Sequence, residues 1–197
     1  MMQEWFQHAK LGIWVHWGLY SVNGIPESWS FYNEQISYDD YMKQAEKFTA
    51  NRYDPKAWAA LFKRAGARYA VLTTKHHDGV ALWDTQCSDL SVVNHTPAGR
   101  DLIRPYAEAM REAGLKVGFY YSHLDWSHPD YASDAPGCTR STHDRDRHLA
   151  WIHGEGKENW ERFLAFHRQQ LRELCEQYGE VDLWWFDGDW RPSADDW

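Results

Sequence analysis

The residues of this chain that are best suited to chemistry follow directly on short apolar runs. Asp187 comes after the apolar run 181–186 and before a glycine, with tryptophans on both sides. A carboxylate in such a place can act as a nucleophile or a general base, whereas most Asp-Gly pairs only start a turn or cap a helix. Polar or ionisable side chains lie at or near the ends of three other apolar runs, namely His16, His76, His77 and Tyr120. This repeated placement favours a shared catalytic or binding role.

The four runs themselves are predicted β-strands. They are too short for helices and are rich in aromatic and β-branched residues, and they span residues 11–17, 69–75, 116–122 and 181–186. Amphipathic or capped segments between them predict helices over residues 38–48, 54–66, 101–114 and 158–178, the second with Asp54 as its N-cap and Pro55 at its first position. A polar, aromatic loop is expected to follow the first strand as far as Asn33, and a further long loop runs from 124 to 156.

This alternation of strands and helices predicts an α/β fold with a parallel sheet. Active-site residues gather at the carboxyl ends of the strands in (β/α) barrels and in open α/β sheets. No glycine-rich phosphate loop follows any of the strands, which argues against a nucleotide-binding sheet. We therefore predict one domain over residues 1–197, built as a (β/α)4 unit that is half of a (β/α)8 TIM-like barrel.

Composition narrows the range of partners. The net charge of −8 argues against a nucleic-acid or anionic-membrane surface, and the thirteen tryptophans fit the recognition of sugars, whose apolar faces stack on indoles. The sequence shows neither a signal-peptide pattern nor an apolar run of transmembrane length, so a cytoplasmic location is expected. Cys87, Cys138 and Cys175 are widely spaced, which predicts free thiols rather than disulfides.

A family resemblance rests on these clusters taken in order along the chain. The matching segments are residues 12–18, 65–79, 82–84, 100–101, 117–122 and 185–188, of which the Lys-His-His-Asp-Gly motif at 75–79 is the most specific. Together they resemble glycoside hydrolase family 29, the α-L-fucosidases. The resemblance implies a retaining exo-glycosidase that removes terminal α-L-fucosyl residues from a fucosylated glycan or fucoside.

The same resemblance implies roles for individual residues. Asp187 matches the family's nucleophile. The sugar pocket would be lined by His16, Trp29, His76, His77, Tyr120 and Trp185. Many members carry Glu-Trp in the first long loop, where this chain has Ser28 and Trp29, with Glu27 one place earlier.

The adjacent histidines also raise the question of a metal. Neighbouring side chains on an extended strand point to opposite sides, and no His-x-His or HExxH spacing accompanies His76 and His77. We therefore expect neutral imidazoles that donate hydrogen bonds to sugar hydroxyls, with no metal and no cofactor.

The resemblance covers only the first half of the family's barrel, and the family's acid/base lies beyond the nucleophile in the second half. Two copies of the chain are expected to complete a barrel as a homo-oligomer, either a dimer of half-barrels or a higher assembly. Alternatives left open are a catalytically impaired sugar-binding half-barrel and a non-functional truncated product. The carboxylates considered as the acid/base are Glu27, Glu34, Asp125 and Asp189.

Overall fold

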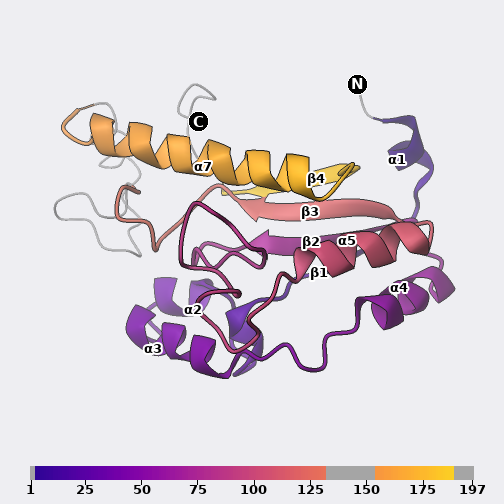
Figure 1. Ribbon diagram of the computed structural model, residues 1–197, viewed down its shortest axis with the longest axis horizontal. Coiled ribbons are helices and arrows are strands. Elements are labelled where there is room, and N and C mark those ends of the chain that lie inside the picture. Colours follow the sequence, from indigo (N-terminus) through magenta and orange to yellow (C-terminus); the bar gives the residue numbers. More distant parts are fainter. Residues whose placement is uncertain (1–2, 132–153, 189–197) are drawn as a thin grey trace.

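The computed structural model describes residues 3–131 and 154–188, and its centre is one parallel sheet (Figure 1). The four strands lie in the order of the sequence, β1-β2-β3-β4, and every neighbouring pair is parallel. Their bounds are Gly12–Val15 (β1), Tyr69–Lys75 (β2), Lys116–Ser122 (β3) and Leu183–Asp187 (β4). The predicted bounds of β2 and β3 are confirmed, whereas β1 is shorter than predicted and β4 begins later and includes Asp187.

All four predicted helices are present between the strands, the one expected over 38–48 as a helix followed by a 3₁₀ turn, and two short helices, one before β1 and one after it, were not predicted. The helices are α1 (Glu4–His8), α2 (Trp29–Tyr32), α3 (Tyr38–Met42), α4 (Pro55–Arg64), α5 (Ile103–Glu112) and α7 (Lys157–Gln177), with 3₁₀ turns η1 (Leu19–Ser21) and η2 (Lys43–Lys47). The predicted cap of α4 is confirmed, because the Asp54 carboxylate accepts a hydrogen bond from the Ala57 amide at 2.9 Å. No helix in residues 3–131 and 154–188 combines the length and apolarity needed to cross a membrane.

Helix α2 lies in a stretch that was expected to be a loop. The turn closes when the amides of Tyr32 and Asn33 donate to the carbonyls of Ser28 and Trp29. Phe31 and Tyr32 are buried against Trp126, so burial of aromatic area stabilises a helical turn that local sequence does not announce. The polar residues around these aromatics give no helical periodicity, so the sequence did not predict this helix.

The two faces of the sheet have different surroundings. On the outer face, Leu72 and Phe119 belong to a hydrophobic core that also holds Phe62 of α4, Met110 of α5 and Leu174 of α7. These three helices cover that face, and the strand arrows point toward the end where α2 and α3 lie (Figure 1).

The inner face carries Trp14 of β1 and Trp185 of β4, whose side chains are 45% and 47% exposed. The apolar run 181–186 also predicts a buried strand; this is wrong for the whole run, because 181–184 are partly exposed and Trp185 and Phe186 are exposed on an edge strand of the described sheet. A flat sheet would hold its first and fourth strands about 14 Å apart. The Trp14 and Trp185 rings nevertheless lie 4.3 Å apart, so the two long side chains meet across the inner face between the edge strands.

A buried carboxylate attaches α7 to the loop that follows β2. The Glu173 carboxylate accepts hydrogen bonds from the Trp83 indole at 2.9 Å, the Thr85 hydroxyl at 2.7 Å and the Gln86 amide at 3.0 Å. The thiol of Cys87 donates to the same carboxylate at 3.3 Å. Cys87 and Cys175 are free thiols, as predicted, and Cys138 lies outside the described residues.

Candidate active site

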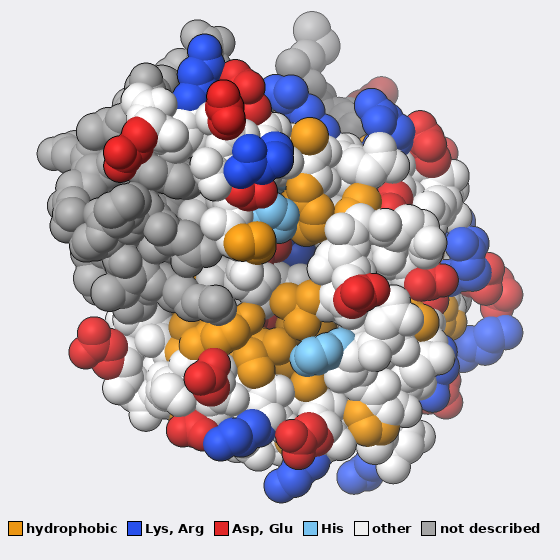
Figure 2. Space-filling view, turned by 60° about the vertical axis from the view of Figure 1, so that its left-hand side comes forward, with side chains coloured by type: hydrophobic (Ala, Val, Ile, Leu, Met, Phe, Trp, Pro, Cys, Tyr) orange, Lys and Arg blue, Asp and Glu red, His pale blue; other side chains and the backbone are white. Residues whose placement is uncertain are grey.

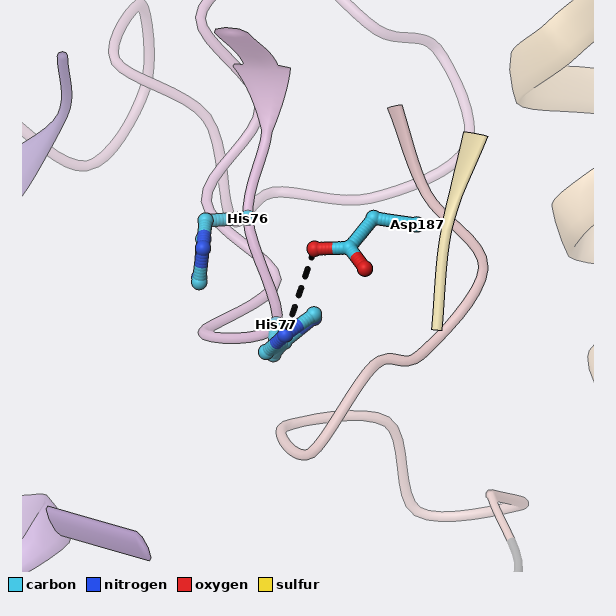
Figure 3. Close-up of side chains that lie close together, drawn as sticks. All are labelled: His76, His77 and Asp187. Atoms are coloured by element: carbon cyan, nitrogen blue, oxygen red, sulfur yellow. Dashed lines mark ion pairs between the residues drawn. The ribbon is translucent and has the colours of Figure 1, made fainter. Parts of the chain in front are cut away.

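The carboxyl ends of the strands open onto a hollow around which hydrophobic side chains gather (Figure 2). Asp187, the last residue of β4, stands there with its side chain 36% exposed. The Tyr120 hydroxyl of β3 donates to Asp187 Oδ2 at 2.6 Å, and His77 Nε2 lies 3.8 Å from the same oxygen. The side chain of Asp187 points from β4 toward His77 and His76, which follow β2 (Figure 3). Three strands therefore bring one carboxylate, one phenol and two imidazoles together.

The two adjacent histidines share this site, which corrects the expectation that they point apart. Their ring centroids are 4.2 Å apart, and ligand atoms of His76, His77 and Asp187 all lie within 4.8 Å of one another. Strand β2 ends at Lys75, and its pairing with β3 shifts register between Thr73 and Lys75. The chain then turns, with the Gly79 amide donating to the His76 carbonyl at 3.1 Å. The alternation of an extended strand therefore no longer applies at 76–77.

Each of these histidines is held by a serine. His77 Nδ1 lies 2.5 Å from the Ser122 hydroxyl, and His76 Nδ1 lies 2.5 Å from the Ser28 hydroxyl. The Ser122 hydroxyl donates its single proton to the Leu124 carbonyl at 2.7 Å, so it must accept from His77 Nδ1–H. Neutral His77 therefore carries its lone pair on Nε2. This atom accepts hydrogen bonds, whereas the sequence analysis expected a donor.

Burial keeps the three histidines of the site neutral near pH 7. It lowers the pKa of His77 to about 3, although the Asp187 charge opposes this shift, and it holds the pKa of His76 well below its usual value. The pKa of His16 is lowered by burial too, against the charges of Glu27 and Asp187. The site therefore combines uncharged imidazoles with a carboxylate.

Aromatic rings form the wall of the site. Trp29, the first residue of α2, lies 5.7 Å from the His77 ring, and Trp126 lies 4.6 Å from it, measured between centroids. The His16 ring packs between His76 at 4.9 Å and Tyr120 at 5.0 Å. Trp185 stands nearer the inner face beside Trp14. Every residue that the sequence analysis placed at the site thus lies at this end or on the inner face next to it.

The candidate acid/base carboxylates differ in their surroundings. Asp125 is buried, accepts a 2.9 Å hydrogen bond from Lys75 Nζ and also accepts from the Ser127 amide and hydroxyl. Burial alone would raise the pKa of Asp125, but Lys75 and Ser127 lower it, so its environment does not suit a proton donor. Glu34 is exposed and Glu27 is half-buried, and Asp189 lies outside the described residues.

Asp78, which belongs to the Lys-His-His-Asp-Gly motif together with the two histidines, is buried. The Tyr41 hydroxyl donates to it at 2.5 Å, and the Val80 amide donates at 3.0 Å. Burial raises the pKa of Asp78 to about 6, although both donors oppose the shift; the charges of Asp125 and Lys75 act on it in opposite directions. Asp78 therefore belongs to the support of the site.

Three residues of the site carry roles that the sequence analysis did not assign. Ser28 and Ser122 orient the histidines, and Trp126 contacts His77 directly. The position of Ser122 at the end of β3 was a usable signal, since neighbouring strand ends meet. No local pattern links Ser28 to a histidine that lies 48 positions away.

Parallel βα units with a polar site at the carboxyl ends of the strands define an α/β protein of the kind that binds small molecules at that face. The model of the α-L-fucosidase family matches residues 1–197. Tissue α-L-fucosidase of Bos taurus is 31% identical over 96% of this chain, and the α-L-fucosidase of Branchiostoma floridae is 31% identical over 100%. The chain therefore belongs to the α-L-fucosidase family.

Solved structures agree with this assignment. α-L-Fucosidase isoenzyme 1 from Paenibacillus thiaminolyticus superposes with a TM-score of 0.80 at 44% identity, over 95% of this chain and 43% of its own. A family 29 enzyme from Bacteroides thetaiotaomicron, a trapped covalent intermediate in complex with 2-fluoro-fucosyl fluoride, has a TM-score of 0.79 at 32% identity, over 95% of this chain and 41% of its own. The chain also spans only 40% and 43% of the two curated relatives.

Proposed function

We propose that this chain carries the nucleophile and most of the sugar-binding wall of a retaining α-L-fucosidase. The observation that supports this best is the Asp187 carboxylate, which is partly exposed at the mouth, oriented by the Tyr120 hydroxyl at 2.6 Å and faced by His77. A retaining glycosidase uses one carboxylate to attack the anomeric carbon and form a glycosyl-enzyme, which water then hydrolyses. The trapped covalent intermediate of the Bacteroides thetaiotaomicron relative supports this mechanism for the family.

The surrounding groups suit a fucosyl residue. His77 Nε2 accepts from a sugar hydroxyl, since Nδ1–H is already donated to Ser122. Trp29, backed by the buried Trp126, offers an apolar surface beside it, and the methyl group of a 6-deoxy sugar leaves no hydroxyl stranded against such a surface. Terminal fucosyl groups of glycans or simple fucosides are therefore the proposed substrates.

The proton shuttle is the incomplete part of the proposal. Retention requires a second carboxyl about 5–5.5 Å from the nucleophile. Asp125 is unsuited because Lys75 holds its charge, and Glu27 is the described candidate whose charge reaches the pocket, through His16. The resemblance implies an acid/base beyond the nucleophile, in a part of the family's barrel that this chain does not span.

We further propose that the sheet is half of a (β/α)8 barrel and that a second copy completes it. The contact of Trp14 with Trp185 at 4.3 Å across the inner face supports this, because inward side chains of different strands fill the interior of such a barrel. In a two-fold pair, β4 of one copy would lie beside β1 of the other. This would pair both edges of the described sheet and cover the exposed inner-face indoles.

The test of the nucleophile is Asp187→Gly assayed on an aryl α-L-fucoside, whose leaving group needs little protonation. Turnover should fall at least about a thousandfold, or roughly 4 kcal/mol in transition-state stabilisation, and azide should restore it with formation of fucosyl azide. Asp84→Gly, at an exposed loop position, is the matched control and should keep parental turnover. Undiminished activity in Asp187→Gly would refute the assignment.

Light scattering across a dilution series tests the second copy. An active species of twice the monomer mass that loses activity as it dissociates supports the proposal. A folded, active monomer contradicts it.

A further inference from the structure

Two hydrogen-bond acceptors face one another across the site. Because Ser122 accepts a hydrogen bond from Nδ1–H of His77, the lone pair of this ring is on Nε2, and Asp187 Oδ2 lies 3.8 Å from that atom. A lone pair and a carboxylate at this separation repel each other. A positively charged or hydrogen-bond-donating group placed between the two atoms would replace this repulsion with attraction.

His76 provides a third potential metal ligand at the same place as His77 and Asp187. Its ligand atom, that of His77 and that of Asp187 lie within 4.8 Å of one another, and the three side chains converge in the close-up (Figure 3). Two imidazoles and one carboxylate are a ligand set that suits zinc and neighbouring transition metals. We propose that His76, His77 and Asp187 bind a divalent transition-metal ion, with Zn²⁺ as the reference case, in competition with a sugar.

The surroundings of the ligands resemble those of zinc sites that keep an open position. Histidines that bind metals generally use their other ring nitrogen in a hydrogen bond that fixes the ring, as Ser28 and Ser122 do here. Tetrahedral ligands with bonds of about 2.1 Å lie roughly 3.4 Å apart, so a pair of ligand atoms 4.8 Å apart must close by about 1.4 Å. Asp187 can supply this movement, because it ends an edge strand and its side chain is 36% exposed.

The consequence is inhibition by the metal. Three protein ligands leave a fourth position to water, but the ion would occupy Nε2 of His77 and the carboxylate that the sugar requires. Zn²⁺ is therefore expected to raise the apparent KM of an aryl fucoside, and a chelator is expected to reverse the effect. This inhibition rests on the proposed function, whereas metal binding does not.

The experiment is calorimetric titration of the full chain with Zn²⁺ alone, which requires no turnover. The parent should bind one ion. Ser122→Ala should bind it roughly 10–100-fold more weakly, as is typical when a group that hydrogen-bonds a metal-binding histidine is removed. His77→Ala and Asp187→Asn should each weaken binding more than that. His95→Ala, which removes an exposed histidine, is the matched control and should bind like the parent. Circular dichroism establishes that each variant is folded before it is titrated.

A second readout separates this site from the thiols. Co²⁺ bound by nitrogen and oxygen ligands should give visible absorption without a thiolate charge-transfer band, and the variant Cys87→Ser/Cys138→Ser/Cys175→Ser should keep it. Zn²⁺ binding that survives both His77→Ala and Asp187→Asn would overturn the proposal, as would absence of binding by the parent or loss of binding with the cysteines.

Discussion

The buried ion pair between Lys75 and Asp125 makes a sharp prediction about how the site is supported. Lys75 is the last residue of β2, and Asp125 opens the loop after β3 that carries Trp126 to the His77 ring. Their side chains are 0% and 2% exposed, and Nζ lies 2.9 Å from Oδ2. The pair therefore fixes two site loops against each other.

The expected magnitude follows from burial. Removal of one partner of a buried pair leaves an uncompensated charge, at a typical cost of about 3–5 kcal/mol. Lys75→Met should destabilise the chain by this amount, although Ser127 still donates to the carboxylate. Asp125→Asn should cost a similar amount because it strands the ammonium. In the double variant neither charge remains, so it should be more stable than the sum of the single effects predicts, by at least about 2 kcal/mol.

Urea unfolding followed by tryptophan fluorescence at pH 7 measures all three variants. Lys43→Met, which breaks an exposed pair with Asp40, is the matched control and should leave the unfolding midpoint unchanged. A Lys75→Met variant within about 1 kcal/mol of the parent, or strict additivity in the double variant, would refute the reasoning.

Three further predictions concern the Lys-His-His-Asp-Gly motif at residues 75–79. The pKa of Asp78 is raised to about 6 from 3.8, so the folded state binds this proton more tightly, and the contribution of Asp78 to stability should fall as pH rises from 4 to 6, by up to about 3 kcal/mol. The buried histidines contribute with the opposite sign, so the test is the difference between Asp78→Asn and the parent in urea titrations: it should shift in favour of the variant by this amount from pH 4 to 6, and a constant difference would count against the assignment. Gly79→Ala should destabilise the chain far more than Gly66→Ala, although both backbones have positive φ. The new Cβ at 79 would lie 2.0 Å from Ser127 Oγ, whereas nothing lies within 4 Å of a Cβ at 66. Equal thermal melting points of the two variants would contradict this. His77→Ala should weaken fucose binding by about 1–3 kcal/mol in calorimetry, and parental affinity would remove it from the pocket.

Much of the scaffold was predictable because its signals are local. The apolar runs of β2 and β3, and the Asp54 cap with Pro55, each depend on a few adjacent residues, and the structure confirms them. The gathering of site residues at the strand ends followed from parallel topology, which places successive carboxyl ends at one edge.

The remainder depended on contacts that are distant in the sequence. Helix α2 forms because Phe31 and Tyr32 pack against Trp126. The direction of the His77 hydrogen bond depends on Ser122 and the carbonyl of Leu124. Strand alternation misplaced His77 relative to its neighbour because the strand had already ended. The exposure of Phe186 could not be read from its composition, since an edge strand and a buried strand share the same apolar run.

The attachment of Glu173 to the loop after β2 has a consequence for the order of folding. Its donors Trp83, Thr85, Gln86 and Cys87 precede it by 90, 88, 87 and 86 positions. During synthesis these donors leave the ribosome long before their acceptor exists, and closing so long a segment is slow compared with forming a local helix. The β2 loop can therefore make these hydrogen bonds only after α7 has emerged and docked, which places that docking late in the assembly of the site.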